Sequence, residues 1–207
     1  MKQLLLDIKP PAPPTLQNFV VGRNAEAIAA LTNNAQSGFI YPKFTDPKFI
    51  YLWGEKGCGK SHLLSACKAM GMRVADDVHL LDNDAQIALF NQYNQLKESG
   101  SFLITAGLHA PTQMGLRDDL ATRLAWGLVY QLHPLNDEEK AQALKQHAAE
   151  RGILLPSEVV DYCLRYLRRD LPTLMATLDA LDEWSLVTKK PVTVPMLKKL
   201  LQLDLGI

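Results

Sequence analysis

The segment GEKGCGKS, residues 54–61, constrains the fold of this chain more than any other stretch of its sequence. It matches the pattern G-x-x-x-x-G-K-[ST], in which glycines let backbone N–H groups turn inward around phosphate oxygens. The apolar run FIYLW, residues 49–53, precedes it and predicts a buried strand, and the pattern of residues 60–70 predicts a helix. A strand, a glycine loop and a helix in this order predict a phosphate-binding loop in an α/β fold.

Two residue types that such a site needs follow the glycines. Lys60 would reach the β- and γ-phosphates of a nucleotide, and the Ser61 hydroxyl would ligate magnesium. Asp76 and Asp77 end the next predicted strand, where Asp76 can hold the metal and Asp77 can orient an attacking water. The alternatives are a glycine turn with a surface lysine and a solvated strand end. The predicted cofactors are ADP or ATP with Mg²⁺. The predicted nucleotide-binding residues are Gly54, Gly57, Cys58, Gly59, Lys60, Ser61 and His62, with Val20 and Val21 from the segment NFVVG.

The chain changes character at Pro134. Before it, predicted strands at 49–53, 73–78, 101–107 and 127–132 alternate with helices, which predicts a parallel α/β sheet. An early helix is expected at 24–34, with Asn24 capping its first turn. After Pro134 the pattern is helical, at 137–150, 156–167, 171–187 and 192–203. We therefore predict an α/β core to about residue 134 and an all-helical lid after it.

Charge and cysteine content narrow the function classes. The 22 basic residues balance the 22 acidic ones, so the net-basic surface of a non-specific nucleic-acid binder is missing. No apolar stretch approaches the roughly 20 residues that cross a bilayer. The three cysteines are odd in number and lack a CxxC pair, which favours reduced thiols and a cytoplasmic location. The five histidines lack the spacing of a zinc site.

The first residues differ from the rest. Residues 1–8 form a short apolar-acidic peptide, and residues 9–17 contain the proline-rich run KPPAPP. Proline at this density favours an extended polyproline conformation, so residues 9–17 are expected to be a tether.

Several segments, in one order, resemble a known family. NFVVG, GEKGCGKSHLL, ADDVHLL, TRLAWGLVYQLHPLNDEEKAQAL and LPTLMATLDALD resemble the AAA+ ATPase module of the bacterial replication initiator DnaA. QLLLDI, residues 3–8, is similar to the Q-L-x-L-x-L peptide by which proteins dock on the replicative sliding clamp. A clamp peptide joined to a DnaA-like module resembles the Hda family, whose members promote hydrolysis of ATP bound to the initiator on clamp-loaded DNA.

The resemblance implies a fold, partners and site residues. It implies a P-loop AAA+ core over residues 18–134, a lid over 135–207, and a negative regulator of replication initiation. Arg123, in TRLAWG, would be an arginine finger acting in trans on the initiator, although a surface arginine stacked on Trp126 is the plainer alternative. DNA would be met only through the clamp, no membrane is involved, and a homodimer is left open. The clamp-binding residues would be Gln3, Leu4, Leu6 and Ile8.

This sequence departs from the family pattern at three places. Pro172 occupies the position of the nucleotide-sensing arginine, and Thr105 is the only polar candidate where an acidic residue follows a strand. Both changes predict weak or no ATPase activity of its own. Only Gly71 and Met72 separate the phosphate-loop helix from RVADDV, so about four core strands are expected, one fewer than usual. RVADDV should then form an edge strand, covered by the N-terminal segment or by a second protomer.

Two other functions fit a phosphate loop in a chain of this length. A small-molecule P-loop kinase would need an acceptor pocket and an arginine-bearing lid, and phosphate transfer to a metabolite would reveal it. A DNA-bound remodeller related to helicase loaders would bind DNA without clamp, in a salt-dependent manner. Its basic patch would consist of Arg165, Arg168, Arg169, Lys198 and Lys199.

Overall fold

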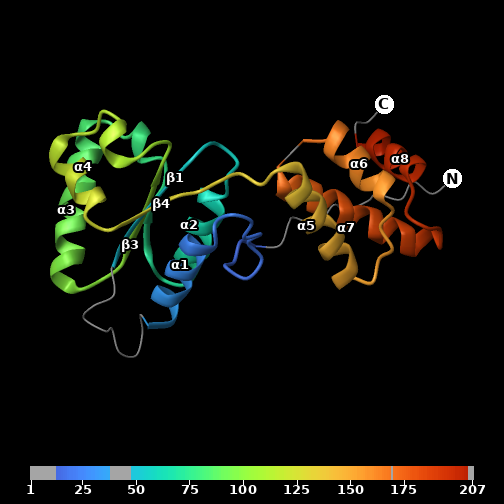
Figure 1. Cartoon of the computed structure of the whole chain (residues 1–207), viewed down its shortest axis with the longest axis horizontal. Helices are drawn as coiled ribbons and strands as arrows, with labels where there is room; N and C mark the ends of the chain where they lie inside the picture. Colours follow the sequence, from blue (N-terminus) through green and yellow to red (C-terminus); the bar gives the residue numbers. More distant parts are fainter. Residues whose placement is uncertain (1–12, 38–47, 169, 205–207) are drawn as a thin grey trace. The chain divides into compact units, whose positions relative to one another are not determined.

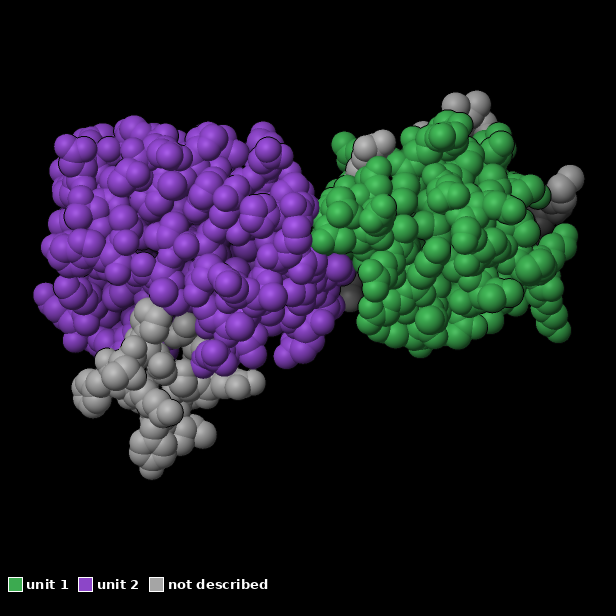
Figure 2. Space-filling view, in the orientation of Figure 1, with its two compact units in different colours: residues 1–12, 135–207 green, residues 13–134 purple. Residues whose placement is uncertain are grey.

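The computed structural model describes residues 13–37, 48–168 and 170–204. The chain divides between Pro134 and Leu135 into two compact units, called here the core and the lid (Figure 2). The expected clamp peptide, residues 1–8, and residues 9–12 of the expected tether lie outside the described residues. Within the described ranges, no helix combines the length and the hydropathy needed to cross a bilayer.

Among the described residues, the core contains a parallel sheet of four strands in the order β2-β3-β1-β4. This confirms the four-strand α/β prediction. Parallel neighbours place all loops that follow the strands at one edge, the carboxyl end of the sheet. The strands are β1 (Phe49–Trp53), β2 (Arg73–Ala75), β3 (Leu103–Gly107) and β4 (Leu128–Gln131).

Helices cover both faces of this sheet (Figure 1). Helices α1 (Ala25–Ser37) and α2 (Lys60–Ala69) pack on one face, around residues such as Leu31, Leu52 and Leu63. Helices α3 (Asn83–Ser99) and α4 (Asp118–Ala125) pack on the other, around residues such as Tyr93, Leu103 and Leu120. Short 3₁₀ turns, η1 (Val78–Leu80) and η2 (Pro111–Gln113), follow β2 and β3.

The second strand is shorter than its sequence pattern predicts. Strand β2 ends at Ala75, whereas the expected strand ran to residue 78. Asp77 adopts a left-handed conformation, with φ of 47°, and Val78 then begins η1. The two carboxylates therefore lie just beyond the strand, on a turn. Strand β2 does lie at an edge of the sheet, as predicted, and what covers that edge stays a prediction.

Asn24 does not have the role that the sequence suggested. It directly precedes α1, but its side-chain amide bonds to His133 rather than capping the helix. Asn24 Nδ2 donates to the His133 carbonyl at 3.0 Å, and the His133 N–H donates to Asn24 Oδ1 at 2.8 Å. The reason is burial: Asn24 is only 3% exposed, and a buried amide must find partners for both of its ends. The bonds join the start of α1 to the exit from β4.

The end of the expected tether belongs to the core. Thr15 and Asn18 exchange side-chain to backbone hydrogen bonds of 2.8 and 3.1 Å, which close a turn. Leu16, inside that turn, is buried in the same cluster as α1 and α2. A tether can therefore extend no further than residue 14.

The described part of the lid, residues 135–168 and 170–204, forms four helices, as the sequence predicts. Its core gathers Leu144, Val160, Leu174 and Leu197, one from each helix in turn. Asn136 and Glu139 form a capping box at the first helix, which fixes where that helix begins. The helices are α5 (Asp137–Glu150), α6 (Ser157–Tyr166), α7 (Leu171–Thr188) and α8 (Val194–Asp204).

Candidate functional site

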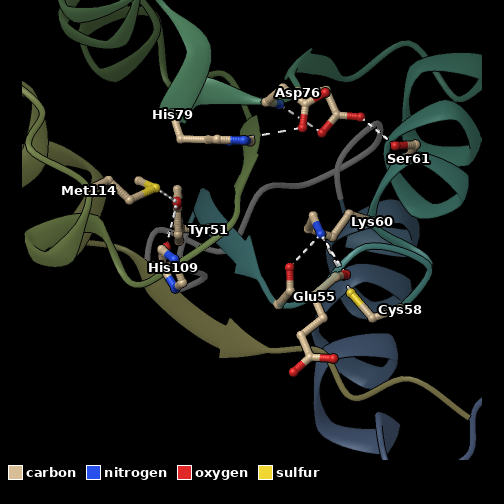
Figure 3. Close-up of polar contacts among 11 residues, drawn as sticks. Tyr51, Glu55, Cys58, Lys60, Ser61, Asp76, His79, His109 and Met114 are labelled. Atoms are coloured by element: carbon tan, nitrogen blue, oxygen red, sulfur yellow. Dashed lines mark hydrogen bonds and ion pairs between the residues drawn. The ribbon is translucent and has the colours of Figure 1, made fainter.

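The glycine loop joins the carboxyl end of β1 to α2 and closes around a lysine (Figure 3). Lys60 is only 8% exposed. Its ammonium group donates to the carbonyls of Gly54 at 2.6 Å and Glu55 at 3.0 Å, and lies 3.7 Å from the Cys58 sulfur. The positive charge is thus held inside the loop rather than in solvent, where the oxygens of a bound phosphate can take over these bonds.

Two glycines of the loop are required by close packing. A Cβ atom on Gly54 would lie 2.3 Å from the Leu132 carbonyl oxygen, and its φ of 151° is also unfavourable for other residues. A Cβ atom on Gly59 would lie 2.5 Å from the Phe19 ring. The sequence NFVVG is therefore packed against the phosphate loop through Phe19. This contact brings the segment of Val20 and Val21 to the loop.

Ser61 and Asp76, the predicted metal ligands, lie together. The Ser61 hydroxyl donates to Asp76 Oδ2 at 2.7 Å, and the second carboxylate oxygen accepts from the Asp77 N–H at 2.8 Å. A hydroxyl and a carboxylate at this distance are the oxygen ligands that Mg²⁺ uses beside nucleotide phosphates. The donor set therefore fits the predicted ion, whose binding stays a prediction.

Asp77 and His79 form a pair that sequence reasoning missed. Asp77 Oδ1 lies 4.0 Å from His79 Nδ1. That nitrogen is buried and has no hydrogen-bond partner in the described part of the chain. From the sequence, every histidine was predicted to be structural or solvated. Only the D-x-H spacing of Asp77 and His79 could have indicated this pair. The predicted role of Asp77 in orienting water is not tested by this geometry.

His62 contacts the turn of residues 15–18 and the Phe19 ring. Its Nε2 atom bonds to the Thr15 carbonyl at 2.9 Å, and its ring meets Phe19 edge-on at 5.4 Å. These contacts hold the turn of residues 15–18 against α2. The nucleotide contact of His62 that the sequence suggested stays a prediction.

Tyr51 fixes the loop after β3, where the family pattern has an acidic residue. Its hydroxyl donates to the His109 carbonyl at 2.9 Å and lies 3.2 Å from the Met114 sulfur. Burial raises the pKa of Tyr51 above its ordinary value, so the phenol stays protonated and can donate. Thr105, the polar candidate in β3, is 2% exposed. The strand and its loop are thus packed with neutral groups.

Arg123 lies at the opposite end of the sheet from the phosphate loop. Gly127, two residues after α4, would place a Cβ atom 2.1 Å from the Phe49 carbonyl, and Leu128 pairs with Ile50. The end of α4 therefore lies beside the first residues of β1, whereas the loop follows its last residue. Five strand residues separate these points by about 13 Å.

The Arg123 side chain stacks on aromatic rings, as the plainer sequence interpretation expected. Its guanidinium carbon is 4.2 Å from the centre of the Trp126 ring and 5.8 Å from that of Phe90. Burial raises the pKa of the Tyr93 phenol, and the Arg123 charge opposes that rise. The guanidinium is thus held at the surface of α4, outside its own phosphate loop.

Comparison with known proteins now gives the relationship. A family model described as the Hda lid domain matches residues 137–201. Domain III of DnaA from Thermotoga maritima superposes with a TM-score of 0.69 at 22% identity, over 94% of this chain and 98% of that one. The lid is therefore Hda-like, and the chain as a whole has the fold of DnaA domain III.

Other solved structures agree on the fold. AMPPCP-bound DnaA from Aquifex aeolicus gives a TM-score of 0.66 at 22% identity, over 84% of this chain and 66% of that protein. The RuvB Holliday junction branch migration motor from Thermotoga maritima gives 0.60 at 14% identity, over 90% and 70%. At these identities the likeness establishes the fold alone, and it confirms the predicted AAA+ core with a helical region after it.

The Hda-like lid has a proline at the first turn of α7. Pro172 follows the cap Asp170, whose Oδ1 accepts from the Thr173 N–H at 3.0 Å. Burial raises the pKa of Asp170, but the bonds from Thr173 outweigh it and the net shift is downward. Proline is tolerated here because first-turn N–H groups have no helical partner. Arg168, which precedes this helix, is exposed, and Arg169 lies outside the described residues.

The suggested basic patch of the lid is mixed in charge. Arg165 lines an open groove of about 680 Å³ together with the carboxylates of Asp137, Glu158 and Asp161. Lys198 stacks over the Tyr162 ring at 5.4 Å. Carboxylates among the cations repel DNA phosphates, so this surface argues against the DNA-bound remodeller.

Proposed function

We propose that this Hda-like protein is a nucleotide-bound negative regulator that inactivates the replication initiator DnaA. In this proposal Arg123 enters the initiator's nucleotide site and stimulates hydrolysis of ATP there. The observation that carries the proposal is the separation of Arg123 from its own phosphate loop, in a chain with an Hda-type lid and a DnaA-like fold. A guanidinium that cannot serve the site of its own chain is available to another.

The chain's own nucleotide has a supporting role in this proposal. Lys60 would hold its phosphates, and Ser61 with Asp76 would hold Mg²⁺, which supplies charge neutralisation when bound. AMPPCP-bound DnaA shares this fold, which supports ATP or ADP as the ligand. Hydrolysis in cis is weak because Pro172 cannot donate a hydrogen bond and Thr105 carries no charge. A ligand that binds only the folded form stabilises it by mass action.

The chemistry of Arg123 is electrostatic. During phosphoryl transfer, negative charge spreads over the equatorial oxygens of the transferred group and the bridging oxygen. A guanidinium placed there stabilises the transition state more than the ground state. Arginine fingers supplied in trans are worth about 10³–10⁵ in rate.

Docking on the sliding clamp would bring the two proteins together. Gln3 would bond to the rim of a pocket on the clamp, and Leu4, Leu6 and Ile8 would fill an apolar groove. These residues lie outside the described part of the chain, so their role rests on the QLLLDI motif alone. The expected tether before residue 15 would raise the effective concentration of the core near the clamp.

The experiment is an ATPase assay of the cognate initiator with clamp and DNA. The unsubstituted chain should stimulate hydrolysis, and Arg123→Ala should lose at least about 10³-fold of the stimulation while keeping nucleotide and clamp binding. Arg117→Ala is the matched control, because Arg117 lies at the start of the same helix and pairs with Asp119 at 3.0 Å. A truncation lacking residues 1–8 should keep its fold but lose clamp binding. Equal stimulation by Arg123→Ala and the unsubstituted chain would remove Arg123 from the mechanism.

A further inference from the structure

Two cationic side chains lie against an exposed tryptophan ring at the end of α4. Trp126 follows α4 directly and is 58% exposed. The Arg123 guanidinium carbon lies 4.2 Å from its ring centre, and Lys97 Nζ, from the end of α3, lies 4.8 Å from the same centre. Large exposed aromatic rings beside arginine are typical of protein interfaces.

The two cations lack a counter-charge among the residues that the structure describes. Neither Lys97 nor Arg123 forms an ion pair there, whereas Arg117 and Arg151 pair with carboxylates at 3.0 and 2.9 Å. Their distances of 4.2 and 4.8 Å from one ring keep the cations within about 9 Å of each other, close to the Debye length at physiological salt. Their mutual repulsion is therefore only partly screened. An incoming anion would relieve it.

The ring also restricts the arginine. The indole attracts the guanidinium to its face, and Phe90 approaches the same guanidinium at 5.8 Å. A long side chain that contacts an aromatic ring loses less rotamer freedom on binding than a free one does. Preorganised charge is also more effective in catalysis than charge that must first be arranged.

We propose that Lys97 and Trp126 complete the surface that acts on the partner. Lys97 is a second cation for the triphosphate of the partner's nucleotide, and Trp126 is a positioning residue that holds Arg123 toward it. This inference rests on the proposed function, because it extends the surface that meets the partner's triphosphate from Arg123 to Lys97 and Trp126. Lys97 contributes to binding of the partner's ATP site, and Trp126 contributes to the rate once bound.

The test titrates variants of this chain into the initiator's ATPase assay. Each titration gives the concentration for half-maximal stimulation and the maximal rate. Lys97→Ala should raise the half-maximal concentration about tenfold at unchanged maximal rate, and Lys97→Arg should restore it. Trp126→Ala should lower the maximal rate about tenfold, and Trp126→Phe should recover most of it, because a phenyl face still attracts the guanidinium. Lys68→Ala, at an exposed lysine in the last turn of α2, is the control and should match the unsubstituted chain.

Two outcomes separate this inference from the proposed function. If Arg123→Ala stimulates normally, the proposed function fails. If Arg123→Ala is inactive but Lys97→Ala and Trp126→Ala titrate like the unsubstituted chain, the proposed function stands and this inference is overturned. Thermal unfolding of every variant checks the fold. If Trp126→Ala unfolds, the inference is tested with Trp126→Phe, Lys97→Ala and Lys97→Arg. A folded Lys97→Ala variant with an unchanged half-maximal concentration would refute the role of Lys97 as a second cation.

Discussion

The two ends of the core sheet differ in how their charged groups are held. At the carboxyl end, Lys60 is buried against two carbonyls, and Ser61 is bonded to Asp76. At the amino end, Arg123 and Lys97 lie on an exposed ring without a carboxylate partner in the described chain. The first arrangement is satisfied internally and suits a ligand held by one chain. The second is unsatisfied and suits a surface that another molecule completes.

The topology of a parallel sheet produces this separation. Every loop that follows a strand lies at the carboxyl end, so the phosphate loop and the Asp76 turn meet there. A connecting helix runs back to the amino end before the next strand begins. Arg123, in the last turn of α4, is therefore carried away from the loop by the same connection that starts β4.

The largest loss of unfolding free energy should come from substituting one glycine at each end of the sheet. The two ends are alike in that each has a glycine packed against a backbone carbonyl. Gly54→Ala forces a Cβ atom to 2.3 Å from the Leu132 carbonyl, and Gly127→Ala forces one to 2.1 Å from that of Phe49. Backbone cannot move aside as a flexible side chain can. We expect each variant to lose about 3 kcal/mol or more of unfolding free energy, measured by urea denaturation.

Gly57→Ala provides the comparison for those two variants. A Cβ atom placed on Gly57 would meet no atom within 4 Å, and only the φ of 83° disfavours alanine there. The expected loss is about 1–2 kcal/mol. If Gly57→Ala destabilised the chain as much as Gly127→Ala, close backbone packing would not explain the glycines.

The next prediction compares nucleotide binding by variants at the two ends of the sheet. Lys60→Ala should weaken ATP and ADP binding at least about 100-fold, equivalent to about 2.8 kcal/mol, because the buried ammonium is lost. Arg123→Ala should leave the nucleotide dissociation constant unchanged. Isothermal titration calorimetry measures both. Lys56→Ala is the control, since Lys56 is an exposed lysine of the same loop. Weakened nucleotide binding in Arg123→Ala would break the division between the two ends.

The last prediction concerns the hydrogen bonds between Asn24 and His133 at the carboxyl end of the sheet. Asn24→Ala removes two hydrogen bonds of 2.8 and 3.0 Å and leaves the His133 N–H and carbonyl without that partner. We expect a loss of about 2 kcal/mol in urea denaturation. Asn91→Ala, at an exposed site of α3, should change stability by less than about 0.5 kcal/mol. A loss as small as that of Asn91→Ala would mean that Asn24 does not secure the exit from β4.

The sequence predicted which segments form strands and which form helices, but it did not predict where β2 ends or which partners Asn24 has. The apolar run before the glycines and the 3.6-residue patterns after Pro134 gave the strands and helices, since periodicity reports which face is buried. The early end of β2 and the bonds of Asn24 depend on neighbours far along the chain. Asn24 and His133 are distant in sequence, so no local pattern couples them.

The same limit applies to the candidate site. The motif predicted Lys60 and Ser61, and the aspartate pair after the next predicted strand gave Asp76. The structure brings the hydroxyl of Ser61 to the carboxylate of Asp76. The sequence could not predict that His79 approaches Asp77 or that the Tyr51 hydroxyl bonds to the loop after β3. Nor could it predict that Lys97 and Arg123 both contact the ring of Trp126. Each of these contacts joins side chains from separate turns, strands or helices.

The sequence by itself determined the fold class, the phosphate loop and the four-helix lid, because these depend on short-range pattern and on residue types with fixed chemistry. Only the tertiary structure decided which groups meet and which end of the sheet each one reaches. Strand order and helix direction set those distances, and both arise from packing the whole core at once. For that reason the loop was predictable from GEKGCGKS, while the two-cation surface around Trp126 was not.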